Sequence, residues 1–187
     1  DNDHFESSHQ TVQYQTRPSI RDNTNQDNVW QDQAKKFVEK CEAHLWSEKG
    51  SSALRYLCEE RGLQENTIVK YRLGYNPIDT HARPEIWGLT NRKIWLPRGI
   101  VIPCFVDGQL WYVNIRRPSG KPKYYKVRGS RAALFGTYNL RGAWLMLLVE
   151  GEFDTMLADQ EIGDVAGIAT FGSAVWNIDL SVWGSYL

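Results

Sequence analysis

The sequence predicts an α+β protein in which helices come first, an antiparallel sheet follows, and a strand–helix–strand unit comes last. Three observations support this class: apolar residues recur at helical spacing between 28 and 62, β-rich runs separated by turns occupy 100–127, and two apolar runs enclose a helix-like stretch between 143 and 170. The 187 residues, 42% of them hydrophobic, are enough for one domain or two small ones that share a core.

Helical periodicity dominates the first part of the chain after its polar start. The first predicted helix begins at Asn28, a residue type that caps helix N-termini, and we expect Gly50 to end it in the left-handed conformation. A second helix is predicted over 51–62 and a third over 65–71. The apolar stripe of the first helix consists of Trp30, Ala34, Phe37, Val38, Cys41 and Leu45.

The pattern then changes to strands. Residues 76–99 contain three prolines, which predicts a loop. Residues 100–106 and 109–116 are β-rich and flank an Asp-Gly pair, which is a strong two-residue hairpin signal. Residues 123–127 add a third strand behind a Pro-Ser-Gly turn. The segment therefore predicts an antiparallel meander.

A strand–helix–strand unit is predicted in the last part of the sequence. Residues 144–149 form the continuous apolar run WLMLLV, which is typical of a parallel strand buried on both faces. Residues 155–161 are helix-like, and we expect Gly163 to end that helix. Residues 165–170 form a second short apolar strand. This order predicts a βαβ unit.

Charge is distributed unevenly although the net charge is zero. Residues 1–33 hold six acids and two bases, with few large apolar side chains and no clear period. Such a segment buries too little surface to offset the entropy of ordering, so we expect residues 1–27 to be a flexible polar linker or tail.

No acidic residue occurs between Gly108 and Val149, where eight basic residues are interleaved with aromatic ones. This combination concentrates positive potential that attracts phosphates, and aromatic faces can stack bases, so we favour a nucleic-acid-binding surface. The alternative is a solvated basic sheet whose aromatic side chains face a core. The residues concerned are Arg116, Arg117, Lys121, Lys123, Lys126, Arg128, Arg131 and Arg141, with Trp111, Tyr112, Tyr124 and Tyr125.

Two acids follow the first predicted strand of the βαβ unit. Glu150 comes directly after it, Gly151 allows a sharp turn, and Asp154 lies in the first turn of the next helix. Sites form at the carboxyl ends of parallel strands, and two carboxylates there suit a hard divalent cation. Glu150 is also placed to act as a general base. The alternative is that both acids only stabilise the positive N-terminal end of the helix.

Composition argues against several classes of protein. No apolar run approaches the roughly 20 residues that a membrane span needs. Cys41, Cys58 and Cys104 are too widely spaced for a zinc motif or a disulfide framework, so we expect buried thiols and a cytoplasmic location. The chain begins at Asp1 without a signal segment, and we expect it to be part of a longer protein.

The acidic turn resembles a known motif. Val149-Glu150-Gly151-x-x-Asp154 is similar to the opening motif of the TOPRIM fold, which bacterial primases, topoisomerases and some nucleases share. Upstream segments resemble the polymerase core of DnaG-type primases, and the resemblance covers residues 51–174 in the family's order. Those segments are Ala53-Leu54-x-Tyr56-Leu57-x-x-x-Arg61-Gly62-Leu63, Leu73-Gly74-Tyr75, Val101-Ile102-Pro103, Asn114-Ile115-Arg116, Pro122-Lys123-Tyr124 and Leu134-Phe135-Gly136.

The resemblance implies a domain organisation and an activity. After the linker, residues 28–142 would form the basic N-terminal subdomain of a primase core, and 143–187 the first part of a truncated α/β TOPRIM domain. The activity would be the synthesis of short RNA primers on single-stranded DNA from ribonucleoside triphosphates during replication. The family's zinc finger and the contact to a replicative helicase would lie outside this chain, which has no zinc ligand set.

Site residues follow from the matched motifs. Glu150 would be the catalytic acidic residue that holds Mg²⁺ or Mn²⁺ and could serve as a base, with Asp154 as its companion in the same catalytic and metal site. Divalent cations of this kind neutralise the charge of a reacting phosphate. The implied contacts to template or nucleotide are Arg116, Lys123, Tyr124 and, by a looser match, Arg61 and Arg131.

The sequence also departs from the family pattern. TOPRIM proteins have an Asp-x-Asp motif at the end of a later strand, whereas Asp179 is followed here by Leu180 and Ser181. Two carboxylates are few for a working magnesium site, so we expect this chain by itself to be inactive, or nearly so, as a primase. The alternatives are a non-catalytic, primase-derived module that binds single-stranded nucleic acid, and another TOPRIM enzyme such as a topoisomerase or nuclease.

Overall fold

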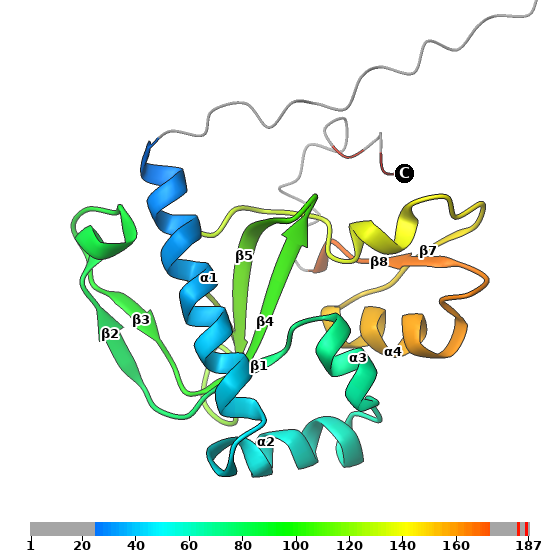
Figure 1. Cartoon of the computed structure of the whole chain (residues 1–187), viewed down its shortest axis with the longest axis horizontal. Helices are drawn as coiled ribbons and strands as arrows, with labels where there is room; N and C mark the ends of the chain where they lie inside the picture. The colour runs from blue at the N-terminus through cyan, green and yellow to red at the C-terminus, as the bar shows by residue number, and fades with distance from the viewer. Residues whose placement is uncertain (1–24, 173–182, 184–185, 187) are drawn as a thin grey trace, which may run out of the picture.

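The computed structural model describes residues 25–172, 183 and 186, which form a mixed α+β structure (Figure 1). The predicted linker 1–27 lies outside the described residues except for its last three. The helices are α1 (Asn25–Leu45), α2 (Ser51–Arg55), α3 (Glu65–Lys70) and α4 (Glu152–Ile162), with short 3₁₀ or π turns η1 (Glu48–Gly50), η2 (Tyr56–Glu60), η3 (Pro84–Trp87) and η4 (Thr137–Leu140). The strands are β1 (Gly74–Asn76), β2 (Thr80–Ala82), β3 (Ile94–Leu96), β4 (Gly99–Val106), β5 (Gln109–Arg116), β6 (Tyr124–Lys126), β7 (Met146–Leu148) and β8 (Gly167–Ala169).

The central element is a four-stranded sheet in the order β1-β4-β5-β6, with every neighbouring pair antiparallel. β4 and β5 pair through Asp107 and Gly108, whose φ angles of 49° and 77° are both left-handed. Two such residues give a turn whose twist matches that of the strands, so the predicted hairpin is confirmed. The meander of β4, β5 and β6 is confirmed as well.

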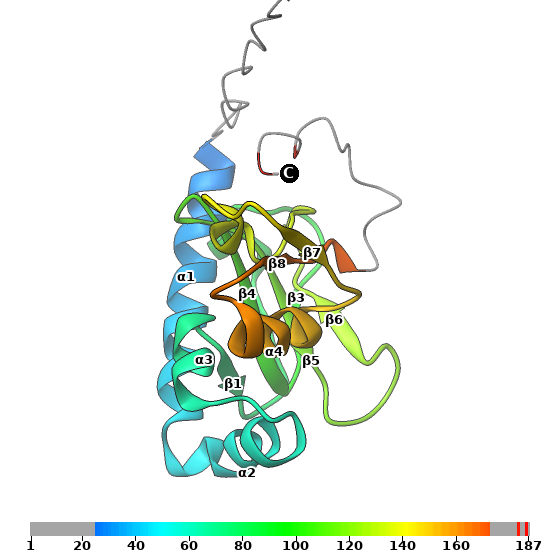
Figure 2. The same ribbon diagram turned by 90° about the vertical axis from the view of Figure 1, so that its right-hand side faces the viewer.

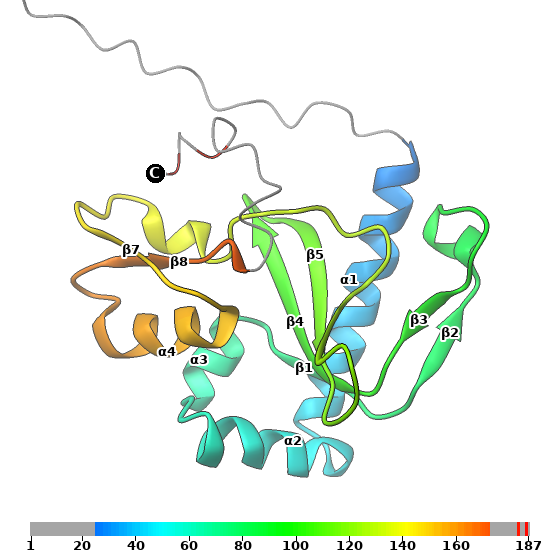
Figure 3. The ribbon, with the colours of Figure 1, turned by 180° about the vertical axis from the view of Figure 1, so that it is seen from behind.

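Helix α1 crosses one face of this sheet (Figures 1 and 3). Its predicted stripe is buried except for Phe37, which is only partly covered. The helix lies so close to β1 that a Cβ on Gly74 would meet the Cys41 backbone carbon at 2.7 Å. Glycine is therefore required at this crossing for close approach of two backbones.

Two predictions about the ends of α1 are wrong. The helix begins at Asn25, and Asn28 lies inside it rather than capping it. Gly50 has φ −96°, which is not left-handed, and a Cβ there would lie 2.3 Å from the Leu45 carbonyl oxygen. The glycine is thus needed because the chain turns back onto the helix end five residues earlier, a close local backbone approach that a capping rule does not consider.

The second predicted helix is confirmed as α2 continued by η2, and Gly62 follows it with φ 70°. The loop predicted over 76–99 is wrong, because this segment contains the antiparallel hairpin β2–β3 around η3. Its strands are three residues each and its prolines lie outside them. Ile94 is fully buried in the core beneath α1, which explains why so short a hairpin is stable.

The βαβ unit is confirmed, because β7 and β8 are parallel and α4 connects them. Figure 2 shows this unit on one side of the molecule, with α4 facing the viewer. The predicted burial of its first strand on both faces is wrong: Trp144 is 88% exposed and Leu148 48%. Within the described residues β7 pairs only with β8, so one strand edge and much of its side-chain surface stay uncovered.

One of the two buried apolar clusters among the described residues nevertheless joins the two parts of the chain. Phe153, Met156 and Ala169 of the βαβ unit pack in one cluster with Leu57 and Tyr112. Cys41 and Cys104 are buried as expected, Cys58 is partly covered, and all three thiols are unpaired. Among the residues described, no helix is both long and apolar enough to span a membrane.

Candidate functional site

A cleft of about 490 Å³ lies between the four-stranded sheet and the start of α4. Strands β5 and β6 provide one wall, the turn from β7 into α4 provides the other, and the residues after β8 and η2 close its ends. Its lining consists of Arg61, Tyr112, Asn114, Tyr124, Lys126, Glu150, Gly151, Glu152, Phe153, Asp154, Phe171 and Gly172. Acids and cations therefore face a common space.

The acidic wall is shaped by the way α4 begins. Gly151 is the N-cap in an extended conformation, and its carbonyl accepts hydrogen bonds from the Thr155 backbone N–H at 2.9 Å and hydroxyl at 3.0 Å. This starts the helix at Glu152 and leaves Glu150 and Asp154 exposed at the cleft. The prediction that both acids share one place after β7 thus agrees with the geometry.

Glu152 connects this turn to the sheet and was missed by the sequence analysis. Its Oε1 accepts hydrogen bonds from Asn114 Nδ2 at 2.5 Å and from the Tyr112 hydroxyl at 3.2 Å. Burial, with the nearby Cys104 and Glu152, raises the pKa of Tyr112 well above its ordinary value, so the hydroxyl keeps the proton that it donates. The alternation of Tyr112, Asn114 and Arg116 along β5 indicates one shared face, but no pattern shows which acid meets it.

Two arginine side chains lie near the ring of Phe153 on the acidic wall of the cleft. This ring is buried, with the Arg61 guanidinium 4.4 Å and the Arg116 guanidinium 5.9 Å from its centroid. Arg116 also lies 4.5 Å from the centroid of Tyr56. Burial raises the pKa of the Tyr124 hydroxyl, and the Arg116 charge opposes this rise. These cation–π contacts hold positive charge close to the acidic turn.

Four of the seven predicted site residues line the cleft: Glu150, Asp154, Arg61 and Tyr124. Arg116, whose guanidinium is 5.9 Å from the Phe153 ring centroid, lines a neighbouring hollow instead. Lys123 is exposed next to Tyr124, and Arg131 lies 4.5 Å from the Trp111 ring centroid; neither lines the cleft. Lys126 does line the cleft; the sequence analysis named it in the basic stretch but not among the site residues. Its place two residues after Tyr124 on a strand puts both side chains on one face.

The cleft offers two carboxylates that are not tied to the sheet. Within residues 25–172, 183 and 186, no group of three or more Asp, Glu, His or Cys side chains is placed to hold a metal ion. Magnesium in proteins is commonly bound by one or two carboxylates together with substrate phosphates. Glu150 and Asp154 fit that arrangement, whereas they do not make a metal cage from protein ligands alone.

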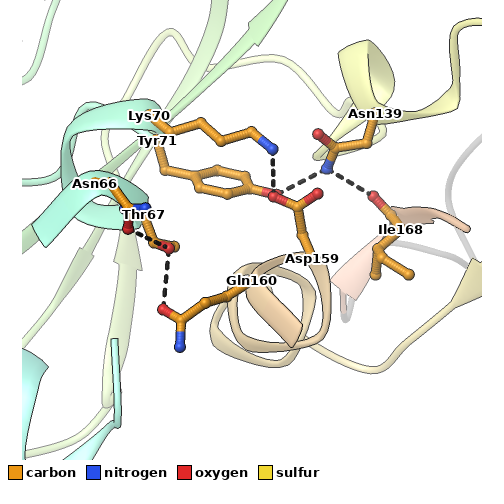
Figure 4. Close-up of polar contacts among 8 residues, drawn as sticks. All are labelled: Asn66, Thr67, Lys70, Tyr71, Asn139, Asp159, Gln160 and Ile168. Carbon is orange, nitrogen blue, oxygen red and sulfur yellow. Dashed lines mark hydrogen bonds and ion pairs between the residues drawn. The ribbon is translucent and has the colours of Figure 1, made fainter. Parts of the chain in front are cut away.

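The position of α4 is fixed by polar contacts with α3 and η4 (Figure 4). The carboxylate of Asp159 is buried and accepts from Lys70 Nζ at 2.6 Å and from the Tyr71 hydroxyl at 3.1 Å. Asn139 Nδ2 donates to the Tyr71 hydroxyl at 2.7 Å and to the Ile168 carbonyl at 3.1 Å. Burial, as the largest cause, raises the pKa of Tyr71. One connected network therefore links α3, α4, η4 and β8.

Gln160 adds a second attachment beside the first. Its Oε1 accepts from the Gln64 backbone N–H at 2.7 Å and from the Thr67 hydroxyl at 2.9 Å, and its Nε2 donates to the Gly62 carbonyl at 3.1 Å. We call the contacts of Asp159 and Gln160 with α3 the α3–α4 clamp. Because α4 also carries the acidic turn at its other end, the clamp helps to orient the acidic wall of the cleft.

Solved structures with a similar fold are known, although sequence comparisons find no match. No family model and no curated protein sequence matches the chain. Among solved structures, it is similar to the DnaG primase catalytic domain bound to ssDNA, with TM-score 0.64 and 20% identity over 79% of this chain and 56% of that one. It is also similar to the E. coli primase catalytic core, with TM-score 0.62 and 19% identity over 79% of this chain and 54% of that one.

A third match is the RNA polymerase domain of Mycobacterium tuberculosis primase DnaG, with TM-score 0.62 and 14% identity over 89% of this chain and 62% of that one. The fold is therefore that of a primase catalytic core. More particularly, the chain has the fold of part of the DnaG catalytic, or RNA polymerase, domain, which confirms the resemblance inferred from its motifs. It spans a little over half the length of the solved domains that it matches.

Proposed function

We propose that this chain is part of a DnaG-like DNA primase, an RNA polymerase that makes short primers on a single-stranded DNA template with a divalent metal ion. The observation that carries this proposal is the shared cleft, in which Glu150 and Asp154 face Arg61, Tyr124 and Lys126. Nucleotidyl transfer needs groups that hold a metal ion and groups that hold phosphates within reach of each other. The cleft supplies both on opposite walls.

The two folded parts of the chain have different roles in this proposal. Residues 28–142 are the basic subdomain that holds the template, and 143–187 are the first part of a TOPRIM domain. The parallel β7–α4–β8 unit, with an acid directly after its first strand, supports the second assignment. The residues ahead of α1, which begins at Asn25, act as the linker. The shared core means that the two folded parts work as one body.

Each side chain of the cleft has a role in this proposal. Glu150 and Asp154 hold Mg²⁺ or Mn²⁺, which when bound neutralises charge on the reacting phosphates. Glu152 is already engaged by Asn114 and Tyr112, so it orients the turn and does not act as a ligand. Arg61, Lys126 and Tyr124 contact nucleotide or template phosphates, contacts that position a strand without reading its bases.

Lys123, Arg116 and Arg131 extend the basic surface beyond the cleft. Lys123 is exposed beside Tyr124, and the Arg116 guanidinium lies 5.9 Å from the ring centroid of Phe153, which lines the cleft. In this proposal they guide the template toward the acidic turn. The partners are thus single-stranded DNA and ribonucleoside triphosphates, with a replicative helicase contacted by regions outside this chain.

Primer synthesis by the complete gene product that contains this chain tests the catalytic part of the proposal. Glu150→Ala should reduce metal-dependent primer synthesis by about 100-fold or more, because a lost metal ligand removes charge stabilisation from the transition state. The matched control is Asp164→Ala, an exposed acid beyond α4 that does not line the cleft. Near-normal synthesis by the Glu150 variant would show that this acid only stabilises the helix end.

A second candidate function is a non-catalytic module that binds single-stranded nucleic acid. It is favoured by one observation: among the described residues, no third acid joins Glu150 and Asp154 in a metal-binding group. In that case the Glu150 variant would bind DNA normally and the wild-type protein would make no primers. Both functions require the basic surface, which a separate experiment tests.

Removal of Lys123 and Arg116 together tests the basic surface. The double variant Lys123→Ala, Arg116→Ala should bind single-stranded DNA more weakly, and its salt slope should fall by about 1.4, because each phosphate contact on a single strand contributes about 0.7. Fluorescence anisotropy at four salt concentrations measures both quantities. Unchanged affinity and slope would remove nucleic-acid binding from this surface and the proposed function with it.

A further inference from the structure

A second hollow of about 390 Å³ lies beside the cleft, between the helical segment α2–η2 and the sheet. It shares no lining residue with the cleft. Its volume is within the range of about 300–1,000 Å³ typical of sites for small molecules. It is lined by Ser52, Ala53, Tyr56, Glu60, Tyr75, Gly99, Ile100, Arg116 and Pro118.

Arg116 separates the two hollows. Its guanidinium lies 4.5 Å from the ring centroid of Tyr56, in the second hollow, and 5.9 Å from that of Phe153, in the cleft. The side chain is half-buried, and its Nε is buried without a hydrogen-bond partner. None of the ion pairs found among the described residues involves it.

A half-buried cation with an unsatisfied donor and no carboxylate partner is costly to maintain. An anionic group of a ligand would accept a hydrogen bond from the Arg116 Nε and would neutralise the charge of the guanidinium. The planar guanidinium matches a phosphate particularly well, because several of its N–H groups can donate to phosphate oxygens at once. The arrangement therefore points to a phosphate at the boundary between the two hollows.

The walls of the second hollow suit a flat, aromatic group. Ser52, Tyr56 and Glu60 are four residues apart along the helical segment, so they lie on one face of it. Tyr75, from β1, contributes a second aromatic ring, and Gly99 leaves the start of β4 without a side chain. Aromatic rings with a few polar groups at the rim are what single-stranded nucleic-acid sites use to stack bases.

We propose that this hollow binds one unstacked base of a single-stranded DNA, while Arg116 holds the phosphate next to it. The inference rests on the proposed function and deepens it by giving the template a fixed anchor beside the acidic turn. Tyr56 and Tyr75 stack on the base, and the strand continues from Arg116 into the cleft. Binding of a base in this hollow requires an aromatic side chain at position 56 and an unobstructed entrance beside Ser52.

The test measures the affinity of the chain for two fluorescein-labelled probes of equal length: a single-stranded DNA with normal bases and the same backbone made of abasic residues. Tyr56→Ala should weaken binding of the normal strand about tenfold, as expected for one lost base stack. It should weaken binding of the abasic strand clearly less, because that strand has no base to lose and only the support of the Arg116 guanidinium by the Tyr56 ring, 4.5 Å from its centroid, is removed. Tyr56→Phe keeps the ring and should bind both probes like the wild type.

A second variant guards against a folding defect. Ser52 is exposed at the rim, so Ser52→Trp should fill the hollow without disturbing the core, and because it leaves Tyr56 under Arg116 it should weaken only the strand with bases. Trp144→Ala is the matched control, since this exposed aromatic lines neither hollow. Circular dichroism and thermal melting establish that each variant is folded.

The outcomes separate the two proposals. If Tyr56→Ala and Ser52→Trp bind both probes like the wild type while the Lys123, Arg116 double variant binds weakly, the base site is wrong and the proposed function stands. If they weaken both probes equally, the hollow serves the backbone and the base site is also wrong. If the double variant binds normally, the proposed function fails and this inference fails with it.

Discussion

The four-stranded sheet and the β7–α4–β8 unit differ in how their strands are covered. Seven of the eight residues of β4 are buried, whereas no residue of β7 is. The sheet has α1 on one face and α2, α3 and α4 toward the other (Figures 1 and 2). Within the part of the chain that the structure describes, β7 has one neighbouring strand and an exposed apolar surface. The difference shows that an apolar sequence does not by itself make a buried strand.

The same two regions meet at the candidate site. The basic wall belongs to the well-covered sheet, and the acidic wall belongs to the unit whose outer strand is exposed. That unit shares a buried apolar cluster with the rest of the chain and is also held by polar and cation–π contacts: Glu152 with β5, Phe153 with two arginines, and the α3–α4 clamp. The orientation of the acidic wall therefore depends on apolar packing and on these polar contacts together.

The largest expected effect comes from truncating one apolar side chain in each region. Ile102→Ala in β4 should lower the free energy of unfolding by about 2–5 kcal/mol, because its fully buried side chain leaves a cavity. Leu147→Ala in β7 should lower it by less than about 1 kcal/mol, since this side chain is 40% exposed. Urea denaturation measures both. Equal losses would mean that β7 is covered in solution.

A smaller effect is expected from the α3–α4 clamp. Asp159→Ala should reduce the free energy of unfolding by about 1–3 kcal/mol, because the buried Tyr71 hydroxyl loses its acceptor and Lys70 loses its ion pair. Asp164→Ala, on an exposed acid near the end of the same helix, should change it by less than about 0.5 kcal/mol. A silent Asp159 variant would show that apolar packing alone holds α4.

The smallest expected effect is a pH dependence that belongs to the sheet side of the molecule. Burial, followed by the charges of Lys49 and Lys40, lowers the pKa of His44. The unfolded chain then binds this proton more readily, so the stability contribution is present above the ordinary pKa of about 6.5 and is lost as pH falls. His44→Gln should flatten the urea midpoint between about pH 7 and pH 5. An unchanged midpoint profile would assign the pH dependence to other groups.

Local patterns predicted the elements whose cause is local. The Asp107-Gly108 turn was predictable because Asp and Gly tolerate the positive φ angles that a two-residue hairpin turn requires. The buried stripe of α1 was predictable because its apolar residues recur at the helical period. The hairpin β2–β3 was not predictable, since strands of three residues carry almost no periodicity. The hairpin is stabilised because Ile94 and Leu96 pack beneath α1, a helix that is far from them in sequence.

The candidate site divides in the same way. Glu150 and Asp154 were predictable because a strand end, a glycine and a helix start are contiguous in sequence. Glu152 was not, because its importance depends on Asn114 and Tyr112, which lie 38 and 40 residues away. Arg116 was predicted as a phosphate contact, but its place between two hollows depends on Tyr56 and Phe153 from separate elements.

By itself, the sequence of this protein determined the helices of the first part, the strands of the meander and of the βαβ unit, the Asp107-Gly108 turn, the basic stretch and the acidic turn after an apolar strand. These features depend on residue type and short-range spacing, which act over one or two turns of chain. Only the tertiary structure decided which acid is tied to the sheet, which face of β7 remains open and which arginine borders two hollows. Those outcomes depend on contacts between distant segments, whose geometry no local pattern contains.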